Sequence, residues 1–395
     1  NVLIKKKYKY ELLENGFNSQ DIAAGKKVLN SKRITMAGNT RKFEDAFAKK
    51  IGSKFALMVN SGSSANLLAL FCLINPLRKK RLKKGDECII PALCWSTSLW
   101  PIIQAGLKPV FVDVNLSDFN ASLEQIEKKI NKKTKAILAI HVLGTSLKID
   151  KLFKICKKKN ILIIEDTCES LGSQYKNKYL GTFGAFGTFS FYYSHQITSG
   201  EGGMIVTNNR KNYELLKIMR AHGWDRDLEK KKVSSKRFNF VNMGFNLRPL
   251  EVSAAIAQNQ LYRLKKFSKI RHINRKKIID SLKKHKNWNE QYQFVTPDKN
   301  LKPSWFGLPL LLKNKNVNKK TKIIKYLKKK GIETRPIISG NFLNQKASKL
   351  YKLNKKKETF PNAEYIEKAG FFIGLHTKKI GTKNLKVLTN HLLNF

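Results

Sequence analysis

The sequence predicts an α/β protein whose core is a largely parallel β-sheet covered by helices on both faces. Two observations support this prediction. From about residue 50 to 210, short apolar runs alternate with charged segments of helical periodicity. The apolar runs are nearly continuous rather than alternating with polar residues, which is typical of strands buried on both faces. Because 42% of the 395 residues are hydrophobic, the chain can bury a core of this kind.

Seven apolar runs are expected to form strands. They are residues 55–59, 87–91, 109–114, 136–142, 161–166, 187–191 and 203–207. Between them, residues 123–130 and 149–158 carry the Lys- and Glu-studded periodicity of surface helices. A long helical region is expected over residues 250–282, followed by a mixed segment that ends at residue 395. We therefore expect a large domain over residues 1–255, and a linking helix with a small second domain over residues 256–395.

The chain is strongly basic. It has 78 Lys and Arg against 28 Asp and Glu, which gives a formal net charge of +50. A nucleic-acid binder usually concentrates such charge on one face or in one tail. Here the clusters recur along the whole chain, at residues 5–7, 78–84, 157–159, 230–232, 328–330 and 355–357. We interpret them as solvated surface lysines whose field attracts small phosphorylated substrates; a nucleic-acid binder, for which no recognition motif is present, is the alternative.

Several other classes of protein are disfavoured. The sequence contains no apolar run of about 18 residues that could form a transmembrane helix. Its first ten residues lack the apolar core of a signal peptide. The five cysteines have no C-x-x-C spacing, so neither a disulfide framework nor a metal site is indicated. We expect a cytoplasmic protein that binds neither membrane nor metal.

Functional groups are expected at the carboxyl ends of the strands, because these ends meet at one edge of a parallel sheet. Residues 60–66 form a Ser- and Gly-rich segment that leads from a strand into a helix. Such a segment can cradle a phosphate, or it can simply cap the helix. Asp166 ends another strand, where its carboxylate can pair with a protonated ring nitrogen or cap a helix. These two segments alone do not decide between the alternatives.

A third segment makes the pattern specific. SFYYSHQITSGEGGM begins at Ser190 and follows NSGSSANLLAL and IIEDTCESLGS along the chain. Together these segments resemble the pyridoxal-phosphate sugar aminotransferases of the DegT/DnrJ/EryC1/StrS family, with further matches at residues 34–48, 220–227, 243–261 and 331–342. The resemblance covers most of the chain. It implies the fold type I, aspartate-aminotransferase-like architecture, with a mainly parallel central sheet between helices and a smaller α+β C-terminal domain. It also implies pyridoxal 5'-phosphate or pyridoxamine 5'-phosphate as the cofactor.

The chain departs from this family at the position of the cofactor-binding lysine, and also at Gln196, where the family's 3-dehydratases often have a second histidine. The family's cofactor-binding lysine lies five residues after the motif serine, and here that position is His195. No lysine occurs from Tyr179 through Arg210, although the protein is otherwise rich in lysine. A histidine cannot hold the cofactor covalently as a lysine does, but it offers a neutral base with an ordinary pKa of about 6.5. The exchange resembles the family's 3-dehydratase branch, in which His195 would be the catalytic base.

The positions of the cysteines distinguish two kinds of dehydratase in this family. One kind carries an iron–sulfur cluster and needs clustered cysteines after the histidine. In this chain no cysteine follows Cys168. The resemblance therefore favours the iron-independent branch of GDP-4-keto-6-deoxymannose 3-dehydratases. It implies removal of the C3 hydroxyl from a nucleotide-linked 4-keto-6-deoxyhexose in deoxysugar biosynthesis of the lipopolysaccharide or O-antigen type, with glutamate re-aminating the cofactor.

The resemblance also assigns roles to individual residues. The cofactor-binding residues it implies are Gly62, Ser63 and Ser190 at the phosphate, Trp95 on the ring face, Asp166 at the ring nitrogen, Glu169 near the ring hydroxyl and Asn246 from a neighbouring subunit. Asn246 thus implies a homodimer with shared active sites. The candidate substrate contacts are His222, Arg248 and Arg335, each of which could equally be a surface or interface residue. Two alternatives to a dehydratase are an aminotransferase that uses another base and a non-catalytic regulator that binds the cofactor.

Overall fold

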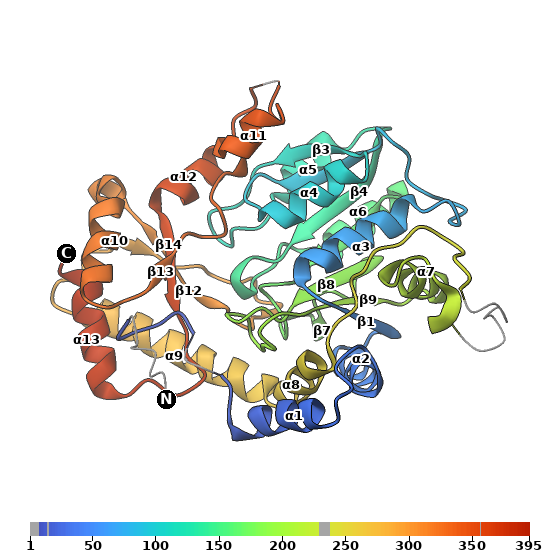
Figure 1. Ribbon diagram of the computed structural model, residues 1–395. Coiled ribbons are helices and arrows are strands. Elements are labelled where there is room, and N and C mark those ends of the chain that lie inside the picture. Colours follow the sequence, from blue (N-terminus) through green and yellow to red (C-terminus); the bar gives the residue numbers. More distant parts are fainter. Residues whose placement is uncertain (1–7, 14–15, 229–237, 356) are drawn as a thin grey trace.

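The computed structural model describes residues 8–13, 16–228, 238–355 and 357–395 (Figure 1). The lysine clusters expected at residues 5–7 and 230–232 lie outside the described residues, as does Lys356. The helices are α1 Ser19–Asn30, α2 Gly38–Ile51, α3 Gly62–Ile74, α4 Ser96–Gln104, α5 Leu123–Lys129, α6 Ile149–Lys159, α7 Arg210–Arg220, α8 Glu251–Leu261, α9 Leu264–Lys284, α10 Lys320–Lys329, α11 Lys346–Leu350, α12 Pro361–Ala369 and α13 Thr382–Leu393, with short 3-10 turns η1 Val142–Gly144, η2 Asp225–Asp227, η4 Asn314–Lys319 and η5 Phe342–Asn344.

The central sheet has seven strands in the order β1-β9-β8-β5-β4-β2-β3. They are β1 Phe55–Val59, β2 Glu87–Pro91, β3 Lys108–Val112, β4 Thr134–Ile140, β5 Leu162–Asp166, β8 Phe186–Ser190 and β9 Gly203–Thr207. The strands from β3 to β8 in that order are parallel, while β9 runs antiparallel to both β8 and β1. All seven expected strands are confirmed, as is the largely parallel α/β core.

Helices cover both faces of this sheet, as the nearly continuous apolar strands predict. On β1, Leu57 and Val59 face a core shared with α3, α4 and α7. Ala56 and Met58 point to the opposite face, where they pack with α2 and α8. Further along the sheet, α5 and α6 cover a third apolar cluster. Because both faces are buried, the free positions for polar side chains are the strand ends.

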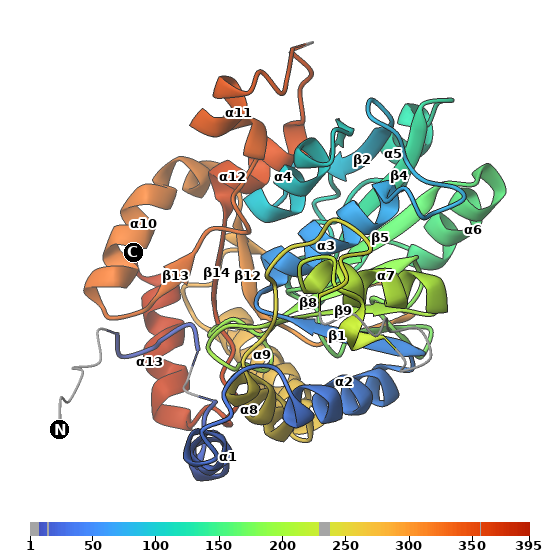
Figure 2. The same cartoon turned by 45° about the vertical axis from the view of Figure 1, so that its right-hand side comes forward.

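The C-terminal part of the chain forms a second, smaller sheet with the order β10-β12-β14-β13, which is antiparallel throughout. These strands are β10 Tyr292–Gln293, β12 Gly307–Leu312, β13 Thr334–Arg335 and β14 Gly370–Gly374, and a separate three-stranded sheet contains β6 Gln174–Tyr175, β7 Lys178–Tyr179 and β11 Leu301–Lys302. In Figures 1 and 2, α10 and α13 lie beside the second sheet and α9 runs from it toward α8. The expected helical region over residues 250–282 consists of two helices, α8 and α9, that are separated at residues 262–263.

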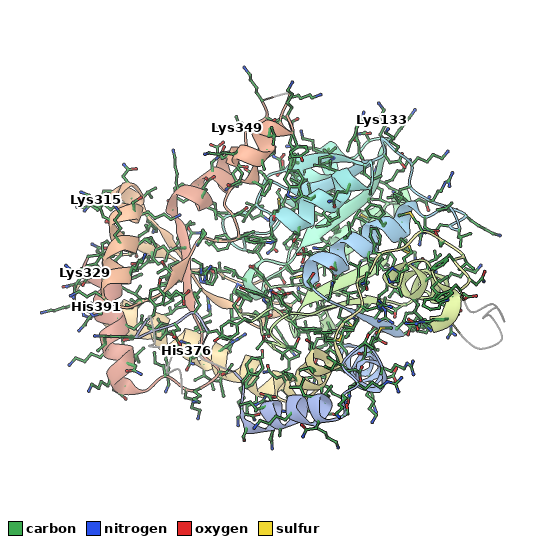
Figure 3. All side chains as sticks on the ribbon, viewed as in Figure 1. Lys133, Lys315, Lys329, Lys349, His376 and His391 are labelled. Atoms are coloured by element: carbon green, nitrogen blue, oxygen red, sulfur yellow. The ribbon has the colours of Figure 1, made fainter. Side chains whose placement is uncertain are left out.

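Exposed lysines recur along the described chain, and Figure 3 labels four of them. The labelled Lys133, Lys315, Lys329 and Lys349 belong to separate segments and point away from the ribbon. This spread supports the interpretation of the charge as a general property of the surface rather than a single binding face. Within the described residues, no helix combines the length and apolarity needed to cross a membrane.

Candidate active site

The turn between β1 and α3 forms a narrow cradle. The Ser61 hydroxyl caps α3 by accepting a hydrogen bond of 3.1 Å from the backbone N–H of Ser64. A Cβ atom on Gly62 would lie 2.6 Å from Cβ of Ser190, so a larger residue would displace the end of β8. Ser63 is exposed on the first turn, and its hydroxyl donates to the hydroxyl of Thr97 over 2.9 Å. The first turn of α3 and the Ser190 hydroxyl therefore meet at a helix N-terminus, which fits a phosphate group.

Asp166 lies at the carboxyl end of β5 with its carboxylate held in place. Oδ2 accepts hydrogen bonds from the Asn66 amide at 2.8 Å and from the Ser98 hydroxyl at 2.7 Å. Oδ1 accepts one from the backbone N–H of Cys168 at 3.2 Å. The side chain is 5% exposed. Three donors thus fix the carboxylate at the end of the strand, where it can pair with a protonated ring nitrogen.

Glu169 follows Asp166 in the loop after β5. Its Oε2 accepts a hydrogen bond of 3.0 Å from the backbone N–H of Leu143. Burial, reinforced by the negative charge of Asp166, raises the pKa of Glu169 to about 7. Near neutral pH this carboxyl group is therefore partly protonated and can either donate or accept a hydrogen bond.

His195 lies five residues beyond the end of β8 and is half-buried. Its ring meets the edge of Phe306 at a centroid distance of 5.1 Å and that of Tyr192 at 6.0 Å. Nδ1 is buried and, among the described residues, makes no hydrogen bond of normal geometry, although the backbone carbonyl of Tyr192 lies close enough to the ring to favour its protonated form. Burial lowers the pKa of His195 to about 3, and the positive charge of Arg271 acts in the same direction. The imidazole is therefore neutral near pH 7 and able to accept a proton.

The loop that carries His195 is fixed by the next residue. Gln196 is 2% exposed, and its side-chain amide donates to the backbone carbonyls of Glu169, at 2.5 Å, and of Ser304, at 3.3 Å. These bonds tie the His195 loop to the Glu169 loop and to the segment before β12. A polar residue at this position thus has a positioning role.

Several supporting residues were missed from the sequence. Asn66, Ser98 and Thr188 orient Asp166, directly or through one another, although they come from three different elements. Asn66 belongs to the Ser- and Gly-rich segment at the start of α3. Nothing in that segment predicts its hydrogen bond to Asp166, which lies 100 residues later in the chain. Only the packing of α3 and α4 over β5 reveals the set.

The other residues predicted from the sequence make no described contact with Asp166 or His195. Trp95 precedes α4 and is 56% exposed. Asn246 is exposed, with its carbonyl oxygen accepting a hydrogen bond of 3.2 Å from Nε of Arg248. His222 is exposed, and Arg335 contacts Glu333 at 3.2 Å on β13. No described hydrogen bond links these five residues to Asp166 or His195.

The groups gathered at the strand ends suit a ligand that carries a phosphate and a protonated aromatic ring. The Gly62 cradle, the Asp166 carboxylate and the His195 imidazole all lie at or just beyond the ends of strands of the central sheet. Among the described residues, no group of three or more His, Cys, Asp or Glu side chains could hold a metal ion.

Comparisons with known proteins agree with this arrangement. GDP-4-keto-6-deoxy-D-mannose 3-dehydratase of Escherichia coli O55:H7 is 39% identical over 376 residues, which cover 93% of this chain and 95% of that protein. A GDP-4-keto-6-deoxymannose 3-dehydratase mutant with bound GDP-perosamine superposes with a TM-score of 0.89 at 37% identity, covering 97% of this chain and 100% of the other. The same kind of enzyme with a trapped pyridoxal phosphate–glutamate geminal diamine superposes with a TM-score of 0.88 at 38% identity, with the same coverage. Residues 17–390 match the DegT/DnrJ/EryC1/StrS aminotransferase family, and the chain belongs to that family.

Proposed function

We propose that this protein is a 3-dehydratase that uses pyridoxal or pyridoxamine 5'-phosphate and acts on a nucleotide-linked 4-keto-6-deoxyhexose. The single observation that carries the proposal is that one site combines Asp166, held by Asn66 at the end of β5, with a neutral His195 in a segment that contains no lysine. The relatives named above support this substrate class, with GDP as the nucleotide. The product belongs to deoxysugar biosynthesis, and a relative named as a lipopolysaccharide biosynthesis protein supports that context.

The cofactor, when bound, supplies an amino group for the sugar ketone and an electron sink for loss of the C3 hydroxyl. We assign its phosphate to Gly62, Ser63 and Ser190, and its ring nitrogen to Asp166. We place Trp95 on the ring face and Glu169 at the ring hydroxyl. The hydrogen bonds to Asp166 hold that carboxylate in place, so it can accept a hydrogen bond from a protonated ring nitrogen.

His195 is the proposed catalytic base. Since Nδ1 is buried, Nε2 is the ring nitrogen that we expect to accept a proton. The imidazole is neutral near pH 7, so the lone pair of this nitrogen is available to accept the proton. The same nitrogen can then deliver the proton to the departing hydroxyl, because a group with so low a pKa releases its proton readily.

The proposal extends to the amino donor, the assembly and the compartment. Glutamate is the donor we propose, in line with the relative that traps it. Asn246 is exposed and free to face a neighbouring chain, which supports a homodimer with shared sites in which His222, Arg248 and Arg335 contact substrate. Cysteines without disulfide spacing support the cytoplasm as the compartment. We place the cofactor domain at residues 1–255 and the linking helix and small domain at residues 256–395; the seven-stranded sheet supports the first and the β10-β12-β14-β13 sheet supports the second.

An aminotransferase is the second candidate, because the fold also matches those enzymes. A spectroscopic experiment separates the two. Pyridoxal phosphate is added to the purified protein, then L-glutamate, and in a parallel sample borohydride. We expect glutamate to convert the bound cofactor to the pyridoxamine form, and borohydride to leave no adduct on the protein. A cofactor fixed to a lysine by borohydride would contradict the proposal and favour the aminotransferase.

A further inference from the structure

The short segment before β12 connects the second sheet to the loops of the candidate active site. The backbone carbonyl of Ser304 accepts a hydrogen bond of 3.3 Å from the side chain of Gln196. The backbone N–H of Ser304 donates to the Ser173 hydroxyl at 2.8 Å. The backbone N–H of Phe306 donates to the carbonyl of Leu143 at 3.3 Å. This segment is therefore hydrogen-bonded to three separate loops, which follow β4, β5 and β8.

Close packing also holds the segment before β12 in place. A Cβ atom on Gly144 would lie 2.5 Å from the carbonyl oxygen of Ser304 and 2.9 Å from Cα of Trp305. Gly144 has a φ of +96°, a backbone conformation that other residues rarely adopt. Trp305 is fully buried, and the guanidinium of Arg275 lies 4.1 Å from the centroid of its ring. The segment therefore has little freedom to move relative to the loop after β4.

Phe306 brings the second sheet into contact with His195. Its ring packs against the imidazole with the centroids 5.1 Å apart and the ring planes at 82°. Phe306 also meets the ring of Phe372 on β14 at 5.9 Å. Because Phe306 is only 9% exposed, it keeps water away from the part of the imidazole that it covers. A ring held by the second sheet thus forms one wall around His195.

Packing is left to fix the orientation of the imidazole. The backbone N–H of His195 donates to the carbonyl of Tyr192 at 3.0 Å, which holds the main chain but not the ring. Among the described residues, Nδ1 makes no hydrogen bond of normal geometry. Two aromatic rings meet the imidazole, and the Tyr192 ring belongs to a residue that is 49% exposed, whereas Phe306 is buried. Phe306 is therefore the better fixed of the two.

We propose that Phe306 is a positioning residue, which holds the imidazole of His195 in the orientation that proton transfer at the cofactor requires. This inference rests on the proposed function, in which His195 is the catalytic base. A base acts only when its nitrogen lies within hydrogen-bond reach of the proton that it removes. A displacement of about 1 Å can lower the rate about a hundredfold, so a rigid neighbour has a direct effect on the reaction.

The test compares Phe306→Leu with Phe360→Leu in the full-length protein. Phe360 is also buried, and its ring meets that of Phe111 at 6.4 Å, without a described contact to His195. Each change removes one buried ring and keeps an apolar side chain. An aromatic ring shifts the NMR frequencies of nearby protons, so the ring protons of His195 report its contact with Phe306. We expect these frequencies to change in Phe306→Leu and to stay at wild-type values in Phe360→Leu, with His195→Gln for assignment.

Steady-state kinetics with the cofactor and the sugar nucleotide test the effect on the reaction. We expect kcat for dehydration to fall about tenfold in Phe306→Leu, because the base is displaced. The KM for the sugar nucleotide and the affinity for pyridoxal phosphate should stay within twofold of wild type, which a general loss of structure would not produce. Phe360→Leu should leave all three values within twofold. If Phe306→Leu does not fold, Phe306→Met removes the ring at a similar volume, with the same expected result.

The outcomes distinguish this proposal from the proposed function. A kcat within twofold of wild type in Phe306→Leu, or an equal loss in Phe360→Leu, would overturn the positioning role and leave the proposed function standing. If the wild type does not dehydrate the sugar nucleotide, the proposed function is wrong. In that case the NMR frequencies of His195 alone decide whether Phe306 holds the imidazole, and unchanged frequencies in Phe306→Leu would overturn that claim as well.

Discussion

Asn66 connects the carboxylate of Asp166 to the neighbouring strand β8. Its amide nitrogen donates to Asp166 at 2.8 Å, and its amide oxygen accepts a hydrogen bond of 2.6 Å from the hydroxyl of Thr188. All three side chains are buried. The orientation of the proposed ring-nitrogen partner thus depends on a residue of α3, the helix whose first turn forms the phosphate cradle.

Asn66→Ala should weaken both the fold and the site. It leaves Asp166 and Thr188 each without one hydrogen bond in a buried place, so we expect the free energy of unfolding of the apoprotein to fall by about 1–3 kcal/mol. The cofactor should bind at least about tenfold more weakly, as measured by titration with pyridoxal phosphate. Asn274→Ala is the control, because buried Asn274 bonds only to residues 376–380 of the C-terminal part in the described structure. A similar loss of cofactor affinity in both variants would contradict a specific role for Asn66.

Gly62→Ala should close the phosphate cradle. The added Cβ would lie 2.6 Å from Cβ of Ser190 and 3.0 Å from Sγ of Cys168, so the loop must shift. We expect affinity for pyridoxal phosphate to fall by about tenfold or more. Gly38 also lies in the first turn of a helix, but an added Cβ there meets nothing within 4 Å. Gly38→Ala should therefore bind the cofactor normally, and unchanged binding by Gly62→Ala would refute the proposed cradle.

Glu169→Gln should stabilise the apoprotein at alkaline pH only. The pKa of Glu169 is raised from 4.5 to about 7, so the folded protein binds this proton more tightly than the unfolded chain does. Stability linked to this group is present below pH 4.5 and is lost as the pH rises through about 7. Glutamine stays neutral, so we expect a gain of about 1–3 kcal/mol near pH 8 and little gain near pH 4.5, measured by urea unfolding. Glu124→Gln, at an exposed position on α5, should show no such gain.

The charge of Arg271 should influence the titration of His195. Arg271 is 1% exposed, and its one described hydrogen bond runs to the carbonyl of Trp305 at 3.4 Å. Because its positive charge disfavours a protonated imidazole, Arg271→Met should raise the pKa of His195, whereas Arg271→Lys should leave it near the wild-type value. Burial, the larger cause, remains in both variants, so the pKa should stay below 6.5. Proton titration of labelled histidines by NMR, with His195→Gln for assignment, gives the values.

The sign of the His195 contribution to stability follows from the same shift. Its pKa in the folded protein lies well below 6.5, so the unfolded chain binds more protons between pH 6.5 and about 3. The part of the unfolding free energy that depends on the neutral ring is fully present above pH 6.5 and is lost as the pH falls toward 3. His195→Gln should make the unfolding free energy less dependent on pH in this window. An unchanged dependence would mean that His195 is protonated freely in the folded protein.

The strands could be predicted from the sequence because a strand buried on both faces is apolar at nearly every position, and such a short continuous apolar run is easily recognised. The antiparallel direction of β9 could not, since it depends on the course of residues 191–202 between β8 and β9. In the described structure this connection forms no helix that could cross the sheet and restore the parallel direction. The break between α8 and α9 was also missed, because no Pro or Gly marks residues 262–263.

The candidate residues that could be predicted from the sequence are those that belong to a recognisable motif within one segment. Gly62, Asp166 and His195 each lie in a motif or replace a residue that the motif requires. Ser98 gave no such signal, because a serine in the first turn of a helix is common, and its partner Asp166 lies 68 residues away in the chain. Gln196 was noticed only as a departure from the family, and its role depends on carbonyl groups that only the folded chain brings near.

The most direct test of the central claim is the identity of the product. The protein is incubated with GDP-4-keto-6-deoxymannose, L-glutamate and pyridoxal phosphate, and the sugar nucleotide and ammonia are quantified by mass spectrometry and an ammonia assay. The account predicts a sugar nucleotide that has lost its C3 hydroxyl, formed together with an equal amount of ammonia. A sugar nucleotide with an amino group at C4 and an intact C3 hydroxyl, formed without ammonia, would contradict it and identify an aminotransferase.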